Sequence, residues 1–424
     1  MSSYLVCSVP IHGHVTPLLE VARHLVGRGD RVRFLTGARY REKVEATGAT
    51  FLPLPREAEY DDSDIDASFP GRVGRTGPAG IRYDLCTIFI APAGAQLAAV
   101  DAAIEDEPVD AMLAETLFVA AAAMLSRPRA QRPRVVNLGI VPLATRHRDV
   151  APMGLGIPPM RGPLGRVRNA VLTMTANRLV FAPVQRVSER VFLEATGRPP
   201  GGLVMDWPSR ADAVVQFTVP GFEYPRPGMP DTVHLVGPMS RGVVSNLPVP
   251  SWWADLDGAH PIVHVTQGTV ANRDYGQLIR PTIEGLAGDD VLVVVSTGGR
   301  DVSTLDFPLP PNVRVAPYLP YDKLLPRTDV MVSNGGYGGV HHAMEHGVPL
   351  VVAGKTEDKT EVNARVGWSG VGINLNTNRP DPVTLARAVR EVLADPSYRT
   401  ASARIGAEIA RSPGLDGLVK VVAG

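Results

Sequence analysis

The chain has 424 residues, of which 44% are hydrophobic and 20% are charged, as in an ordinary globular protein large enough for two domains. Lysine plus arginine and aspartate plus glutamate each number 43, so no net charge draws the chain to nucleic acid or to an anionic membrane. The two cysteines, Cys7 and Cys86, lie far apart without metal-ligand spacing, which excludes a disulfide framework and a cysteine zinc site.

Strand-like and helix-like patterns alternate along the chain, which predicts α/β architecture with parallel sheets and helices on both faces. Residues 4–7 form the first expected strand, residues 10–13 a turn, and residues 31–36 the second strand. The helix between them ends at Gly27 or Gly29, and its apolar stripe consists of Leu18, Val21, Ala22 and Leu25. The start lacks a basic stretch, and no apolar run of about 18 residues occurs, so we expect a cytoplasmic protein without an integral membrane segment.

Boundary signals divide the chain into two Rossmann-like halves. A Pro/Gly-rich passage follows residue 220, and a second α/β series begins at residues 262–265. The expected parts are a domain at 1–220, a linker at 221–250, a second domain at 251–400 and a C-terminal helix at 401–424. Residues 55–82, rich in Asp, Gly and Pro, are expected to be either a lid over an acceptor or a surface excursion.

Residues 331–366 are the most informative segment. An apolar strand ends at Ser333, and Asn334, Gly335 and Gly336 form a tight turn before a helix whose free N–H groups face that turn. A phosphate binds at such a helix N-terminus. Gly347-Val348-Pro349 ends the helix, and a second strand leads to Glu357, Asp358 and Lys359, a loop suited to sugar hydroxyls.

This segment resembles the donor-binding signature of family-1 glycosyltransferases with the GT-B fold, which include bacterial macrolide and other natural-product enzymes and plant UDP-sugar enzymes. The family reads His-Gly-Gly-x-Gly-Thr-x-x-Glu-Ala-Leu-x-x-Gly-Val-Pro and then Asp-Gln, and the matching residues here are Gly335, Gly336, Gly338, Gly347, Val348, Pro349 and Asp358. The resemblance implies two Rossmann-like doubly wound domains that face each other across a cleft, with the last helix crossing back onto the N-terminal domain.

Four polar positions depart from the signature: Asn334 replaces histidine, Gly339 threonine, His342 glutamate and Lys359 glutamine. His342 can accept a hydrogen bond from a ribose hydroxyl only while its ring is neutral. These changes leave the donor open between UDP-linked and dTDP-linked sugars.

Residues 10–17, which follow the first strand, resemble the family's Gly-His-x-x-Pro motif, and this makes His14 the expected catalytic base. The alternative is that His14 only caps the first helix or satisfies a turn carbonyl. Glu115, which ends a strand-like run, is the expected partner of His14, against the alternative of a surface carboxylate in a loop. Asp110 is the weaker candidate for this partner.

Two further segments are similar to donor contacts of the family. Residues 265–269 resemble its Gly-Thr or Gly-Ser phosphate loop, so Gly268 and Thr269 are expected at the diphosphate unless they form a simple turn. Residues 312–321 resemble the segment that holds the base: Tyr318 replaces the stacking tryptophan, Leu319 follows it, and Tyr321 replaces glutamine.

The resemblance implies an inverting, metal-independent transfer of a sugar to a hydroxyl of a hydrophobic natural product, such as an antibiotic, or of a lipid. A nucleotide sugar is then the co-substrate, and no tightly bound cofactor is expected. Apolar runs at residues 113–125, 140–143 and 171–181 are expected to line the acceptor site or to be core. The alternatives are a catalytically silent relative that only binds a ligand and a nucleotide-sugar epimerase. The sequence does not specify an oligomeric state.

Overall fold

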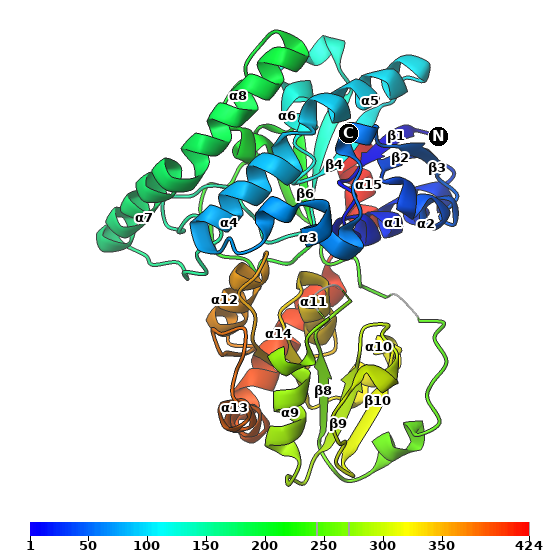
Figure 1. Ribbon diagram of the computed structural model, residues 1–424, viewed down its shortest axis with the longest axis vertical. Coiled ribbons are helices and arrows are strands. Elements are labelled where there is room, and N and C mark those ends of the chain that lie inside the picture. The colour runs from blue at the N-terminus through cyan, green and yellow to red at the C-terminus, as the bar shows by residue number, and fades with distance from the viewer. Residues whose placement is uncertain (243–244, 270–271, 424) are drawn as a thin grey trace.

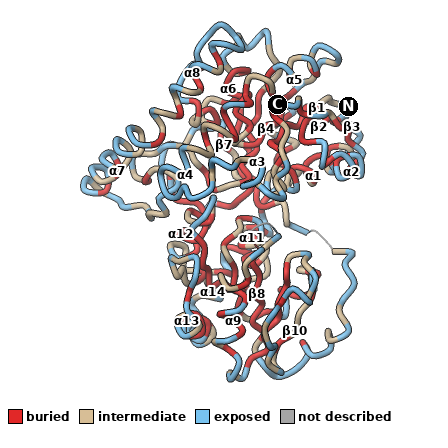
Figure 2. The backbone as a smooth tube through the Cα atoms, in the orientation of Figure 1, coloured by how far each residue is buried: buried red, intermediate tan, exposed pale blue. Residues whose placement is uncertain are grey.

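In the computed structural model the chain forms two α/β domains, one above the other in Figure 1, and the structure describes all residues except 243–244, 270–271 and 424. Each domain is built on its own parallel sheet, as the alternating sequence pattern predicts. The strands are the most deeply buried parts of both domains (Figure 2), because helices cover both faces of each sheet.

The N-terminal sheet has seven strands within the described residues, in the order β3-β2-β1-β4-β5-β6-β7, and all its pairs are parallel. The strands are β1 (Ser3–Cys7), β2 (Arg31–Thr36), β3 (Thr50–Pro53), β4 (Ala111–Glu115), β5 (Arg134–Gly139), β6 (Ala213–Gln216) and β7 (Val233–Leu235). From the β1-β4 pair, later strands are added on both sides: β2 and β3 next to β1, and β5, β6 and β7 next to β4. The carboxyl ends of β1 and β4 therefore form the switch point, where ligands bind to a doubly wound sheet.

The C-terminal sheet has six strands within the described residues, in the order β10-β9-β8-β11-β12-β13. They are β8 (Ile262–Thr266), β9 (Leu292–Ser296), β10 (Val313–Ala316), β11 (Val330–Ser333), β12 (Leu350–Val352) and β13 (Gly372–Asn374). Its switch point lies between β8 and β11, so the turns after these two strands meet at one edge.

The helices of the N-terminal domain are α1 (His12–Gly27), α2 (Arg41–Glu45), α3 (Ile65–Ser68), α4 (Gly77–Tyr83), α5 (Ala93–Asp106), α6 (Ala120–Leu125), α7 (Pro163–Ala176) and α8 (Ala182–Thr196). Those of the C-terminal domain are α9 (Ile279–Leu286), α10 (Tyr321–Leu324), α11 (Tyr337–Glu345), α12 (Lys359–Ser369), α13 (Pro382–Ala394) and α14 (Pro396–Arg411). The final helix, α15 (Leu415–Ala423), follows them. In Figure 1, α11 and α12 lie at the end of the C-terminal domain that faces the N-terminal domain.

The domain limits differ from the expected ones at two places. β7 lies inside the expected linker at 221–250 yet pairs with β6, because its short apolar stretch extends the N-terminal sheet. The expected helix at 401–424 is two helices: Ile405 and Ile409 of α14 pack in the C-terminal core, while Leu418 and Val422 of α15 pack with the core of the N-terminal domain. In Figure 1 the red α15 accordingly lies beside β1 and α1.

The segment at 55–82 is not one structureless loop, since α3, α4 and short 3₁₀ turns lie within it. The helical stretch Gly77–Asp106 has the length and apolar composition of a membrane span. Its side chains Ile90, Leu97 and Val100 are buried in the N-terminal core, however, as in a core helix of a globular domain.

Candidate active site

His14 and Glu115 meet at the switch point of the N-terminal sheet. β1 and β4 are paired so that Cys7 lies beside Ala114, and this register brings the turn after β1 next to the end of β4. Nδ1 of His14 lies 3.0 Å from Oε2 of Glu115. Since the ring N–H is poorly aligned with that oxygen, the contact is an ion-pair contact rather than a good hydrogen bond; catalytic contacts often become better aligned only when substrate binds.

Neither His14 nor Glu115 has the structural role that was its alternative. The expected turn at residues 10–13 is wrong in part, because α1 already begins at His12 with Ile11 as its N-cap, so His14 lies in the first turn of the helix and is not its cap. Glu115 is fully buried and is not a surface carboxylate. Its oxygens also accept from the N–H of Leu117 at 2.6 Å and of Val9 at 3.4 Å, which fixes the carboxylate toward α1.

The surroundings of His14 favour its charged form. Burial lowers the pKa of the ring, but the Glu115 carboxylate, together with Asp358 and Glu357 of the C-terminal domain, outweighs burial, so the pKa of His14 is raised above its usual value of 6.5. Because Nδ1 faces Glu115, Nε2 is the nitrogen that can take a proton from a substrate. Asp358 and Glu357 of the C-terminal domain are therefore close enough to this ring to contribute to the shift of its pKa.

The glycine turn before α11 has the geometry of a phosphate site. Gly335 has φ +92°, and a Cβ at this position would lie 1.8 Å from Oδ1 of Asn363, so only glycine fits. Gly336 is the N-cap of α11 and has no side chain to cap it, and Gly338 and Gly339 follow in the first turn. The first N–H groups of the helix are therefore left to an anion.

Asn334, in the turn after β11, contacts the turn after β8 at the C-terminal switch point. Its Nδ2 donates to the carbonyl of Gln267 at 2.5 Å, so one of the two N–H groups of this amide is used within the protein. Gly268 has φ +71° and its carbonyl accepts from Nδ2 of Asn272, while Thr269 is exposed. Gly268 and Thr269 thus lie at the same sheet edge as the α11 turn.

The three residues expected at the base of the nucleotide have different surroundings. Tyr318 is 50% exposed and is free to stack on a ring. Leu319 is 5% exposed and packs in a core cluster, so its backbone is the part left for a ligand. The hydroxyl of Tyr321 lies 3.1 Å from Nε2 of buried His264, so this side chain is held within the domain.

His342 is neutral at neutral pH. Burial and the neighbouring His346 and His341 lower its pKa to about 4. Its ring stands edge to face with Tyr321 at a centroid distance of 5.6 Å. His342 therefore meets the condition for accepting a hydrogen bond from a hydroxyl group.

Lys359 and Asp358 lie at the start of α12, with Asp358 as the N-cap. Lys359 is 6% exposed, and its ammonium group pairs with the carboxylate of Glu357. The lysine charge is thus compensated within the loop. Burial raises the pKa of the Asp358 carboxyl, against the opposing charge of Lys359.

Sequence reasoning missed Asp62 as a support of α1. Its Oδ2 accepts from the N–H of His12 at 2.6 Å and its Oδ1 from the hydroxyl of Tyr40 at 2.7 Å, so it caps the helix that carries His14. Nearby, Arg273 of the C-terminal domain donates to the carbonyl of Ser63. No local pattern indicates these contacts, because Asp62 and His12 are 50 positions apart.

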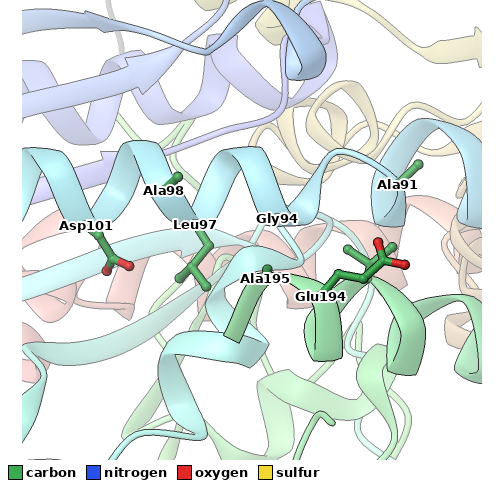
Figure 3. A pocket seen from close by; sticks show the side chains of 8 residues that line it. Ala91, Gly94, Leu97, Ala98, Asp101, Glu194 and Ala195 are labelled. Atoms are coloured by element: carbon green, nitrogen blue, oxygen red, sulfur yellow. The ribbon is translucent and has the colours of Figure 1, made fainter. Parts of the chain in front are cut away.

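Two surface grooves lie away from His14. One, of about 430 Å³, lies between α5 and α8 and is lined mainly by small residues with Asp101 and Glu194 (Figure 3). The other, of about 450 Å³, lies near residues 256–262. Neither groove contains an expected site residue, so neither bears on the site. Among the described residues, no group of three or more His, Cys, Asp and Glu is arranged to hold a metal ion.

Comparisons with known proteins show the family of this chain. The chain is 40% identical over 430 aligned residues to 4'-demethylrebeccamycin synthase of Lentzea aerocolonigenes, covering 99% of this chain and 98% of that protein. It is 36% identical to UDP-glycosyltransferase 2 of Phaeomoniella chlamydospora, covering 93% and 89%. The chain belongs to the GT-B glycosyltransferases. Residues 282–423 match the family model for the C-terminal domain of erythromycin biosynthesis protein CIII-like proteins.

Solved glycosyltransferase structures share the fold. The calicheamicin glycosyltransferase CalG4 has a TM-score of 0.74 at 22% identity, covering 100% of this chain and 98% of that chain. The spinosyn rhamnosyltransferase SpnG complexed with thymidine diphosphate has a TM-score of 0.69 at 15% identity, covering 100% of both chains. The predicted GT-B fold, with two Rossmann-like domains, is confirmed, and the chain is a glycosyltransferase of the nucleotide-sugar type.

The pH dependence of transfer tests the pairing of His14 with Glu115. Glu115→Gln removes the carboxylate that raises the pKa of His14, while burial continues to lower it. With His14 as the expected base, the acidic limb of kcat/KM reports the protonation of its ring, and this limb is therefore expected to move to lower pH. We expect kcat to fall about 10- to 10³-fold through loss of ring orientation. A pH–rate profile measures both effects, and an unmoved limb would contradict the pairing.

Proposed function

We propose that this glycosyltransferase transfers a sugar from a UDP- or dTDP-linked donor to a hydroxyl of a hydrophobic natural product or lipid, with inversion and without a metal. The observation that carries the proposal is the contact of 3.0 Å between Nδ1 of His14 and the buried carboxylate of Glu115. This pair, close enough to Asp358 for the two domains to interact electrostatically, has the parts of a general base at a donor site.

In the proposed reaction, Nε2 of His14 takes the proton of the acceptor hydroxyl while that oxygen attacks the anomeric carbon. The bond between this carbon and the donor phosphate oxygen breaks, and its electron pair remains on the departing diphosphate. A single displacement of this kind inverts the anomeric centre. The buried Glu115 carboxylate stabilises the imidazolium that forms.

The leaving diphosphate needs charge stabilisation, and the N-terminus of α11 is the group proposed for it. The first-turn N–H groups after Gly336, together with Gly268 and Thr269, are placed at the edge shared by β8 and β11. Tyr318 is the proposed stacking surface for the base, and Asp358 and neutral His342 are the proposed acceptors for sugar hydroxyls. Donors on the backbone make a metal unnecessary in this proposal.

The relatives support a natural-product acceptor. They include 4'-demethylrebeccamycin synthase and UDP-glucosyltransferases, and one solved spinosyn rhamnosyltransferase is complexed with the spinosyn aglycone. Of the three apolar runs expected at the acceptor, residues 113–125 and 140–143 are largely buried core. Val171, Met174 and Leu179 are about half exposed, so the stretch at 171–181 is the one with apolar surface to offer.

Mass-spectrometric measurement of nucleotide-sugar hydrolysis tests the donor without knowledge of the acceptor. We expect slow release of UDP or dTDP from a matching sugar donor in the presence of EDTA, and calorimetry should give a dissociation constant of about 1 µM to 1 mM for that diphosphate. Transfer to 4-methylumbelliferone then tests the use of a hydroxyl on an apolar ring, and NMR of the product gives the anomeric configuration.

A catalytically silent relative is the second candidate, because Asn334, Gly339 and His342 depart from the donor signature. The contact of Asn334 with Gln267 bears on it, since this bond leaves at most one N–H of the amide for a phosphate. Absence of binding of UDP, dTDP and GDP would decide for this candidate.

A further inference from the structure

A buried ion network joins the N-terminal domain to α12. It consists of Glu223, Arg226, Glu361 and Arg365, which are exposed by 3%, 9%, 5% and 1%. Arg365 of α12 donates to Oε2 of Glu361 at 2.9 Å and to Oε2 of Glu223 at 3.0 Å. Two carboxylates and two guanidinium groups balance each other in this interdomain ion network.

The network holds one particular segment of the N-terminal domain, the β5–α7 loop (residues 140–162). Near its beginning, the N–H of Leu143 donates to Glu223 at 3.0 Å and the Leu143 carbonyl accepts from Arg226 at 2.6 Å. Further along, the N–H groups of Gly154 and Gly156 both donate to Oε1 of Glu361, at 2.8 and 2.9 Å. Two separate points of the loop thus depend on the network.

The loop approaches α12 as closely as glycine permits. Gly156 has φ +61°, and a Cβ there would lie 2.7 Å from Cγ2 and 2.9 Å from the carbonyl oxygen of Thr360. Thr360 directly follows Lys359, so the contact lies at the sugar-binding end proposed for α12. Compared with apolar packing, a buried ion pair adds little net stability. The contribution of this network is instead a fixed orientation of the β5–α7 loop relative to α12.

The β5–α7 loop also borders the catalytic pair. It leaves the sheet at Gly139, and the preceding Leu138 is paired with Glu115. The loop therefore starts at the same sheet edge as His14, where the proposed reaction needs the acceptor hydroxyl, and contacts α12 at Gly154 and Gly156. Its position determines how the acceptor side and the donor side are aligned.

We propose that Glu361 is a positioning residue for acceptor binding: its carboxylate holds the β5–α7 loop at Gly154 and Gly156 against α12, so that the acceptor stays aligned with the sugar. This inference rests on the proposed function for its effect on transfer, whereas the tether itself can be measured without any substrate.

Amide hydrogen exchange of the full chain is the first measurement. Glu361→Ala removes the acceptor of both glycine N–H groups, and Gly156→Ala displaces the loop from Thr360 without changing a charge, which keeps the test valid if the first variant is poorly folded. We expect exchange in residues 152–158 to rise about tenfold or more in both variants. Gly197→Ala, at φ +70° in open space at the end of α8, is the matched control and should leave that segment unchanged. Unchanged exchange in both test variants would overturn the tether.

Kinetics with UDP-glucose and 4-methylumbelliferone is the second measurement. We expect the acceptor KM to rise about tenfold or more in both variants, while UDP binding and UDP-glucose hydrolysis change less than about twofold. Glu361→Gln keeps an oxygen for the two N–H groups and should restore most of the acceptor affinity. Equal loss of UDP binding, or an unchanged acceptor KM, would overturn the positioning role. Failure of the wild-type protein to bind any nucleotide would instead overturn the proposed function, with the exchange result still standing.

Discussion

His14→Ala is expected to lower kcat for sugar transfer by about 10² to 10⁴-fold, the usual contribution of a general base. The variant loses the ring whose Nδ1 faces Glu115 and whose Nε2 is the proposed proton acceptor. UDP binding should remain, because the residues proposed for the donor site belong to the C-terminal domain. Steady-state transfer to 4-methylumbelliferone and calorimetry with UDP measure the two quantities.

His12→Ala is the matched control for this substitution. His12 lies in the same first turn of α1, but its ring is near Thr16 and burial lowers its pKa, with Lys43 adding to the effect. We expect less than about a fivefold change in kcat, since no proton transfer is proposed for it. Equal activity of the two variants, or near-full activity of His14→Ala, would show that another group is the base.

Gly335→Ala is expected to weaken UDP binding by about 100-fold or more and to destabilise the C-terminal domain by about 2 to 4 kcal/mol. The new Cβ would lie 1.8 Å from Oδ1 of Asn363, and the backbone at φ +92° does not suit alanine. Asn363 cannot easily withdraw, because it is 1% exposed and its Nδ2 donates to the carbonyl of Gly354 at 2.9 Å. Thermal unfolding and calorimetry with UDP measure the two effects.

Gly288→Ala serves as the control for the glycine turn. Gly288 follows α9 in the same domain, and an added Cβ there meets no atom within 4 Å. We expect its melting temperature and UDP affinity to match those of the wild type. If Gly335→Ala also behaved like the wild type, the turn before α11 would not be the diphosphate site.

Local sequence signals predicted much of the fold. The first helix ends at Gly27, with Gly29 at φ +86°, and the second strand runs over Arg31–Thr36 as expected. Gly347, at φ +67°, follows the end of α11 as the Gly-Val-Pro stop predicts. These features depend on hydrophobic period and on backbone angles that only some residues adopt, and both can be read along the chain.

The glycine turn before α11 was predictable for the same reason, but the contacts of the neighbouring side chains were not. The glycines before α11 indicate a close backbone approach from sequence alone. The sequence does not show that Asn334 donates to Gln267, that Glu357 pairs with Lys359, or that Leu319 is core. The contact of Asn334 with Gln267 joins residues 67 positions apart and depends on which loops the packed sheet brings together, whereas the pair of Glu357 and Lys359 is local and depends on the conformation of its own loop.

By itself the sequence determined the two α/β domains, the glycine turn and the strand end that carries Glu115. Only the tertiary structure decided that Glu115 is buried against His14, that α15 packs with the N-terminal core, and that Glu361 holds Gly154 and Gly156. The physical reason is the range of the interactions. Helix periods and turn angles are set by neighbours in the chain, whereas the β1-β4 pair and the contact of Gly154 with Glu361 join residues that are more than one hundred positions apart.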